Sequence, residues 1–241
     1  MTVQKVFARH EVKYLITKAQ RALIEERMEP YMRPDEFGRS SICSLYCDTP
    51  DSLLIRRSIE SPIYKEKLRL RSYGRAGDED TIYIEVKKKF DSVVYKRRVG
   101  MKQSDAMEAL ASCSMPGSDQ ISREIDFFLK RYGSLKPAMT IIGDRQAFYA
   151  KDDHEFRVTF DENIRYRADN LTLNAPPDGI ALTDSDTILM ELKAGGAIPL
   201  WMCRLLSEQK IFKTSFSKYG GAYRQIHSKE IQNGKLVQGI V

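Results

Sequence analysis

The sequence lacks the features that would place the chain in a membrane or in an oxidising compartment. No apolar run reaches the roughly eighteen residues of a membrane span. The N-terminal stretch mixes charged with apolar residues and does not resemble a signal peptide. The four cysteines are scattered and have no paired CxxC spacing. We therefore expect reduced thiols, no transmembrane segment and a cytoplasmic location.

Several common catalytic and phosphate-binding motifs are also missing. The three histidines, His10, His154 and His227, are too far apart in sequence to suggest a metal site. The chain has no Gly-x-Ser-x-Gly elbow and no P-loop. If this protein binds phosphate, side chains rather than a glycine-rich loop must do it.

The composition is that of a globular protein with a modest excess of positive charge. The 241 residues are 42% hydrophobic and 30% charged, which suffices for one substantial core, and we expect a single domain over residues 1–241. The net charge of +6 favours anionic partners. Basic residues alternate along strand-like segments instead of forming runs, and no recognition-helix or zinc-finger spacing appears. This pattern favours a small, buried polyanion over nucleic acid.

The periodicity of apolar residues predicts an α+β domain built from antiparallel hairpins with helices packed outside. A hairpin turn is expected at Asp91–Ser92 and a loop over 174–186. Strands are predicted over 6–16, 40–47, 64–73, 82–90, 93–99, 136–149, 156–167 and 187–193. Helices are predicted over 18–32, with Thr17 as N-cap and Pro34 after its end, and over 51–59, 104–111, 122–132, 199–209 and 218–227.

The most informative pattern is charge on one face of several strands. Side chains two residues apart on a strand share a face, so each such segment has one apolar and one ionic side. For any single strand, a solvated sheet face is the better explanation of the pattern. Because the pattern recurs on successive strands, we expect charged faces that converge on one polyanion. The residues are Lys67, Arg69 and Arg71, then Lys87 and Lys89, then Glu191 and Lys193, with Arg157 on its own strand.

Glutamates precede lysines by two residues at three places, namely Glu11-x-Lys13, Glu85-x-Lys87 and Glu191-x-Lys193. Carboxylates suit a hard divalent cation, and the lysines beside them suit the phosphates that this cation would bridge. The alternative is a set of lateral surface ion pairs, each of which contributes only about 0–1 kcal/mol. Ser217 and Lys218 begin a predicted helix whose N-terminus favours anions, although a plain helix cap is the alternative.

These segments resemble the vacuolar transporter chaperone (VTC) domain, in order and over nearly the whole chain. The matching segments are Arg9–Tyr14, Ser44–Thr49, Lys67–Tyr73, Ile84–Lys89, Glu191–Lys193 and Ser215–Tyr219. The family belongs to the triphosphate tunnel metalloenzymes, so the resemblance implies a closed antiparallel β-barrel of about eight strands with a polar lumen. It also implies synthesis of polyphosphate from ATP with a divalent metal, Mn²⁺ or Mg²⁺.

Roles for individual residues follow from the resemblance together with the alternation. Catalytic roles are predicted for Lys13, Arg69, Arg71 and Glu191. Metal binding is predicted for Glu191 and for Glu11, whereas Glu85 is expected to balance charge. Lys96 and Arg145 depend mainly on the resemblance. The predicted substrate-binding residues are Lys13, Arg69, Arg71, Lys87, Lys89, Lys96, Arg145, Arg157, Lys193, Ser217 and Lys218.

The chain departs from the wider superfamily at one position. Where many tunnel enzymes have Glu-x-Glu-x-Lys, it has Arg9-x-Glu11-x-Lys13. A cation in place of one carboxylate argues against a two-metal hydrolytic site and favours a single metal and a retained polyphosphate product.

Three functions remain open at this point. The first is a metal-dependent polyphosphate polymerase acting on ATP, the second a triphosphate or nucleoside triphosphate hydrolase with the same fold, and the third a non-catalytic polyphosphate-binding module. The regulatory SPX domain and membrane helices of the eukaryotic complex have no counterpart here. We therefore expect a stand-alone catalytic domain, and a protein partner that directs its product remains unidentified.

Overall fold

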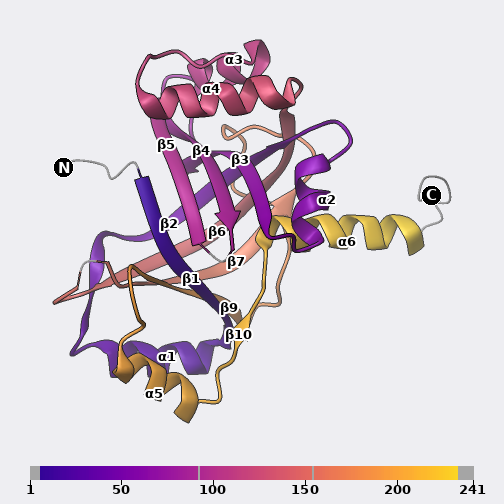
Figure 1. The fold of residues 1–241 in the computed structure, drawn as a ribbon. Coiled ribbons are helices and arrows are strands. Elements are labelled where there is room, and N and C mark those ends of the chain that lie inside the picture. Colours follow the sequence, from indigo (N-terminus) through magenta and orange to yellow (C-terminus); the bar gives the residue numbers. More distant parts are fainter. Residues whose placement is uncertain (1–5, 92, 154, 233–241) are drawn as a thin grey trace.

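The computed structural model describes residues 6–91, 93–153 and 155–232, and in this part of the chain one antiparallel sheet carries six helices (Figure 1). The strands are β1 (Val6–Thr17), β2 (Met32–Asp48), β3 (Tyr64–Tyr73), β4 (Thr81–Phe90), β5 (Val93–Lys102), β6 (Lys136–Ala150), β7 (Arg157–Arg167), β8 (Ile180–Ala181), β9 (Thr187–Ala194) and β10 (Lys213–Thr214). The helices are α1 (Lys18–Met28), α2 (Leu53–Ile59), α3 (Gln103–Ser112), α4 (Gln120–Tyr132), α5 (Leu200–Glu208) and α6 (Lys218–Gln232).

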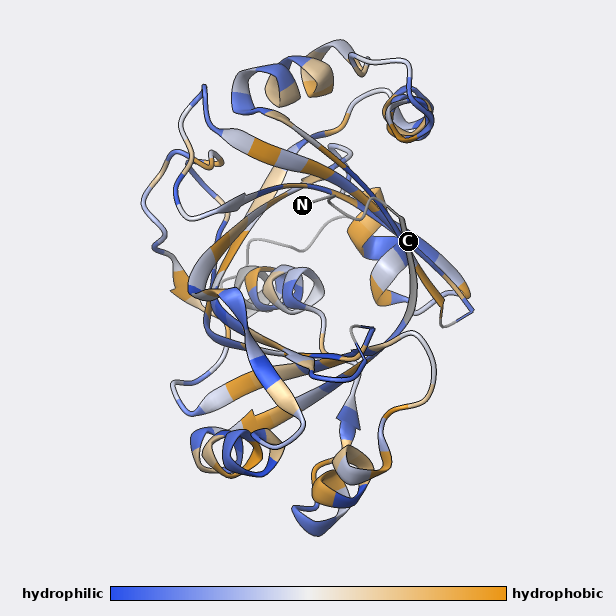
Figure 2. Ribbon diagram, turned by 90° about the vertical axis from the view of Figure 1, so that its left-hand side faces the viewer, coloured by the Kyte–Doolittle hydropathy of each residue, from blue (hydrophilic) through white to orange (hydrophobic). Residues whose placement is uncertain are grey.

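The sheet curves strongly (Figure 2). Its strand pairing is not that of the closed antiparallel barrel that we expected. Its strand order is β10-β1-β5-β4-β3-β2-β6-β7-β8, which leaves the two-residue strands β10 and β8 at its ends. Strand β9 lies off this path and pairs with β1 and β7. Strand β1 changes neighbour along its length, from β5 at residues 6–9 to β9 at residues 10–17. The prediction of a simple closed barrel is therefore wrong. Strand β1 pairs with β5 over one part of its length and with β9 over the rest, and the path of paired strands ends in the short strands β10 and β8.

Three apolar clusters hold the helices on the sheet. The first joins strands β2 to β5 with α3 and α4, and includes Leu68, Ile84 and Phe128. The second joins β1, β7 and β9 with α1 and α5, which lie together at one end of the molecule in Figure 1. The third packs α2 and α6 against β2, β6 and β7. The first two clusters leave the opposite face of their strands to polar side chains. The third cluster lies on that polar face, where its Tyr46 pairs with Arg69 across the β2–β3 ladder. No helix in the described ranges is long and apolar enough to cross a membrane.

Buried Asp48, at the end of β2, ties two helices to the sheet. Its carboxylate accepts hydrogen bonds from the backbone N–H groups of Leu54 and Ile55 in the first turn of α2, at 2.8 and 3.0 Å. It also accepts one from the Tyr219 hydroxyl of α6 at 3.0 Å. Free N–H groups at a helix start favour such a carboxylate. Asp48 thus sets where α6 begins, beside the charged face of the sheet.

Most predicted elements are present, but several of their boundaries differ. Helix α1 starts after Thr17 with the predicted cap, yet it ends at Met28, and Pro34 lies inside the long strand β2. The sequence around Pro34 is too polar to indicate a strand by itself. Strand β8 interrupts the segment 174–186 that was predicted to be a loop. Part of the predicted hairpin turn, Ser92, lies outside the described residues.

Candidate functional site

Strands β3, β4 and β5 align their charged side chains in rows across the concave face of the sheet. Residues two apart on a strand share a face, so neighbouring rows point to the same side. One row across the three strands consists of Lys67, Lys87 and Lys96, and the next row consists of Arg69, Glu85 and Arg98. The period-two pattern read from the sequence therefore becomes a two-dimensional array of charge once the strands pair.

Glu85 organises the first group of charges, which we call the Glu85 cluster (Glu85, Arg69, Arg71, Lys96 and Arg98). Its carboxylate is completely buried and lies 2.7 Å from Arg69 Nε and 3.2 Å from Lys96 Nζ. Arg98 Nε and Arg71 Nε follow at 3.6 and 3.8 Å. Burial raises the pKa of Glu85, but the surrounding cations more than offset this and hold it well below its ordinary value. Glu85 therefore stays ionised and fixes the cations around it.

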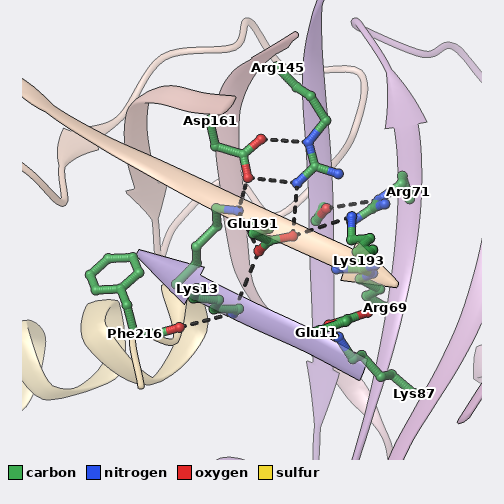
Figure 3. Close-up of polar contacts among 12 residues, drawn as sticks. Glu11, Lys13, Arg69, Arg71, Lys87, Arg145, Asp161, Glu191, Lys193 and Phe216 are labelled. Carbon is green, nitrogen blue, oxygen red and sulfur yellow. Dashed lines mark hydrogen bonds and ion pairs between the residues drawn. The ribbon is translucent and has the colours of Figure 1, made fainter. Parts of the chain in front are cut away.

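Two further carboxylates organise a second group, the Glu191 cluster (Glu191, Asp161, Lys13, Arg145, Lys193 and Lys218; Figure 3). The Glu191 oxygens lie 3.4 to 3.7 Å from the terminal nitrogens of four basic residues, namely Lys13, Arg145, Lys193 and Lys218. Asp161 accepts two hydrogen bonds from Arg145, at 2.5 and 2.6 Å, and one from Lys218. Although burial opposes ionisation, these cations hold the pKa of Glu191 well below its ordinary value.

Glu11 and the residues just before α6 add two more cations to this face, Lys87 and Lys67. Glu11 accepts a 2.6 Å hydrogen bond from Lys87. Burial raises the pKa of Glu11, but Lys87 and Lys193 bring it down to about 2. Lys13 donates to the Phe216 carbonyl at 2.9 Å, and Lys67 donates to the Ser217 hydroxyl at 3.2 Å. The residues just before α6 are thus bound to cations from both β1 and β3.

Positive charge is in large excess on this face. Burial lowers the pKa of Lys96 to about 7 and those of Lys67 and Lys193 to about 8, with neighbouring cations adding to the effect. Like charges this crowded are costly unless an anion enters, so the array suits a polyanion of several charges. Among the described residues, four carboxylates on this face, Glu11, Glu85, Asp161 and Glu191, accompany ten basic side chains, namely Lys13, Lys67, Arg69, Arg71, Lys87, Lys96, Arg98, Arg145, Lys193 and Lys218.

Most of the predicted site residues lie in this array, but three differ. Arg157 is bound to Asp35 of β2 at 2.9 Å, with its side chain 40% exposed. Lys89 faces Lys65 across the β3–β4 ladder, and it has no ion pair among the described residues. The Ser217 hydroxyl accepts the Gly220 N–H at 3.2 Å and so serves as a helix cap. The eight other predicted phosphate ligands, Lys13, Arg69, Arg71, Lys87, Lys96, Arg145, Lys193 and Lys218, surround Glu11, Glu85, Asp161 and Glu191.

Sequence reasoning assigned no role to several residues that the array contains. Asp161 lies four residues after Arg157 on the same strand face, a spacing that could have identified it. Arg98 follows Lys96 by two residues, whereas Lys67 was expected on the charged face of β3 but was not among the predicted ligands. No sequence pattern marks Tyr46 as a site residue, yet its hydroxyl accepts a 3.2 Å hydrogen bond from Arg69. Its ring stacks on Tyr219 with centroids 4.6 Å apart, a contact that only the tertiary structure reveals.

The carboxylates fit a divalent metal only in combination with phosphate oxygens. In the part of the chain that the structure describes, no three Asp, Glu, His or Cys side chains form a group that could hold a metal ion. Glu11 and Glu191 are close enough to influence each other's ionisation. Mg²⁺ is commonly bound through one or two carboxylates plus substrate phosphates, and this donor set suits such a shared site. The Arg9 side chain, on which the expected departure from the superfamily depends, lies outside the described part.

Comparison with known proteins adds a family and a fold. The family model of the VTC domain matches residues 8–227. The solved structure of a "putative adenylate cyclase" from Bacillus halodurans has a TM-score of 0.57 at 14% identity, covering 89% of this chain and 96% of that one. One of the same description from Vibrio parahaemolyticus has a TM-score of 0.46 at 13% identity, covering 94% and 99%. No curated protein matches. At 14% identity, the first likeness shows a shared fold alone.

Proposed function

Because this chain belongs to the VTC domain family, we propose that it is a metal-dependent polyphosphate polymerase that uses ATP. The observation that carries the proposal is the array of ten basic side chains around four carboxylates on one concave face. A polyphosphate chain carries about one negative charge per phosphate, and Arg and Lys side chains are its natural partners. The array extends over several strands, which suits a chain better than a single phosphate.

In the proposed reaction, an oxygen of the terminal phosphate of the growing chain attacks the γ-phosphorus of ATP. A new P–O bond forms as the bond to the β–γ bridging oxygen breaks, and ADP leaves with that electron pair. Phosphoryl transfer depends mainly on in-line positioning and on neutralisation of charge. The acceptor is already an anion, so no dedicated general base is required.

The chain's own residues supply positioning and charge for this step. Arg69 is held by Glu85 and Tyr46, and Arg145 is held by Asp161, so both guanidinium groups are ordered before the substrate arrives. Lys13 and Lys218 both approach the Oε1 atom of Glu191 and can contact phosphate oxygens as point charges. A substrate therefore meets a preorganised lining rather than flexible surface lysines.

A divalent metal, Mn²⁺ or Mg²⁺, is part of the proposal. Glu191, with Glu11 as the second carboxylate, would hold it together with substrate phosphates. Bound there, the metal would neutralise charge on the transferred phosphoryl group.

The test is the product formed from ATP and Mn²⁺ by the unaltered protein and by two variants. We expect a polyphosphate ladder on a gel from the unaltered protein. Arg69→Ala and Glu191→Ala should each lower the rate at least about 1,000-fold, the order of magnitude of one arginine in phosphoryl transfer. Arg56→Ala and Glu79→Ala remove charges from exposed ion pairs and should leave the rate unchanged.

Each alternative has a distinct outcome in this experiment. Release of orthophosphate without polymer would identify a hydrolase instead. Tight polyphosphate binding in calorimetry without metal-dependent turnover would identify a binding module. Full activity of both the Arg69 and the Glu191 variant would contradict the assignment of the site itself.

A further inference from the structure

An aromatic group lies at one end of the charged face and has no role in the reaction proposed above. Tyr73 follows Arg71 by two residues on β3, so it continues the series Lys67, Arg69 and Arg71 on the same face. Tyr83 of β4 pairs with Arg71 and shares that face. The lining thus changes from basic to aromatic within one step along the strands.

Tyr73 and Tyr83 are held in a defined arrangement with Arg98. The two rings meet edge to face, with centroids 6.0 Å apart and planes at 84°. The Arg98 guanidinium carbon lies 3.3 Å from the Tyr83 ring centroid, and Arg98 donates a 3.3 Å hydrogen bond to the Tyr73 hydroxyl. Opposite Tyr83, β5 has Gly100, where a Cβ would come within 3.3 Å of the Tyr83 ring. The glycine therefore gives this ring room to lie across the sheet.

The group stands where the buried charges open to solvent. Tyr73 is 52% exposed, whereas Arg71 is only 8% exposed. Through its hydroxyl, Tyr73 is bonded to Arg98, a member of the Glu85 cluster. Arg98 in turn reaches Glu85 at 3.6 Å. An exposed aromatic ring is therefore fixed at the rim of the phosphate-binding array.

We propose that Tyr73, held in place by Tyr83 and Arg98, is the surface on which the base of the nucleoside triphosphate stacks. This inference rests on the proposed function. It concerns the base of the nucleotide, because the charged array described above accounts only for the phosphates. Residues two apart on a strand are about 7 Å apart, which sets Tyr73 beyond the residues that would hold the phosphates. Base–aromatic stacking tolerates any base but is strongest for large π-systems.

The test compares binding of a non-hydrolysable ATP analogue with binding of inorganic triphosphate, both measured by calorimetry with Mn²⁺. Stacking of one base changes the affinity by about 5- to 150-fold. Tyr73→Ala should weaken binding of the analogue by about that factor and leave triphosphate affinity within twofold. Tyr73→Phe keeps the ring and should bind both nearly normally. Tyr95→Ala is the matched control, since Tyr95 is 40% exposed and lies on the other face of β5.

The possible results separate this inference from the proposed function. Equal weakening of both ligands by Tyr73→Ala, or no weakening of either, overturns the base-stacking role while leaving the phosphate site intact. Failure of the unaltered protein to bind triphosphate at all overturns the proposed function and this inference with it. A loss confined to the nucleotide analogue, rescued in Tyr73→Phe, supports it.

Discussion

Glu85→Gln offers a direct test of how the charged face is held together. The substitution keeps the shape of the side chain but removes the one negative charge at the centre of the Glu85 cluster. Arg69 and Lys96 lose a partner at 2.7 and 3.2 Å, and Arg98 and Arg71 lose one at 3.6 and 3.8 Å. Because Glu85 is completely buried, bulk solvent does not reach this position to screen the cations that remain.

The expected cost follows from this geometry. Removing one partner of a buried ion pair destabilises a protein by about 3–5 kcal/mol, because the remaining charges stay buried without compensation. For a chain of this size, each kcal/mol lowers the melting temperature by about 2–4 °C. We therefore expect Glu85→Gln to lower the melting temperature by roughly 6–20 °C. Glu79→Gln is the matched control, since its carboxylate is 78% exposed and its 2.7 Å pair with Lys102 lies at the surface.

Thermal unfolding with and without triphosphate provides the measurement. A saturating ligand stabilises the unaltered protein by about 2.7 kcal/mol at a hundred times its dissociation constant. In Glu85→Gln the ligand also supplies the missing negative charge, so the gap between the two proteins should narrow on addition of triphosphate. Equal melting temperatures for Glu85→Gln and Glu79→Gln would refute the reasoning. A gap that triphosphate leaves unchanged would show that the ligand does not reach these cations.

Two further predictions concern pH and the exposed end of the site. Triphosphate affinity should fall as pH rises through about 7 to 8, because the lowered pKa values of Lys96, Lys67 and Lys193 cause these lysines to lose protons there, whereas the anion binds their charged forms. Calorimetry at pH 8 in two buffers of different ionisation enthalpy should detect uptake of protons when triphosphate binds. This uptake should be smaller in Lys96→Met. Binding without proton uptake would contradict the prediction that these lysines become charged. Asp35→Asn should release Arg157 and tighten binding of long polyphosphate about two- to fivefold at low salt. Asp51→Asn is the control. If Asp35→Asn binds polyphosphate no more tightly than this control does, Arg157 does not reach the polyphosphate chain.

The charged faces were predictable because strand periodicity is a local property. Side chains at alternate positions share a face in any strand, so the grouping of Arg69 with Arg71, or of Glu191 with Lys193, needs no knowledge of the fold. The start of α1 was equally local, since Thr17 and Gln20 form a capping box within one turn.

Errors arose where partners distant in sequence decide the outcome. Pro34 lies in β2 because that strand pairs along β6, not because of its own sequence. The predicted closed barrel failed because β1 divides its length between β5 and β9. For Arg157 the phosphate-binding role stays a prediction, and the structure adds a partner 122 residues away, Asp35.

The sequence by itself therefore determined which side chains share a face of each strand and that these faces are rich in cations. Only the tertiary structure decided which carboxylate balances which cations. Glu85 gathers cations from β3 and β5, while Glu191 and Asp161 gather them from β1, β6, β9 and α6. The physical reason is range: alternation acts over two residues, whereas ion pairing depends on a few ångströms between strands that the curvature and register of the sheet bring together.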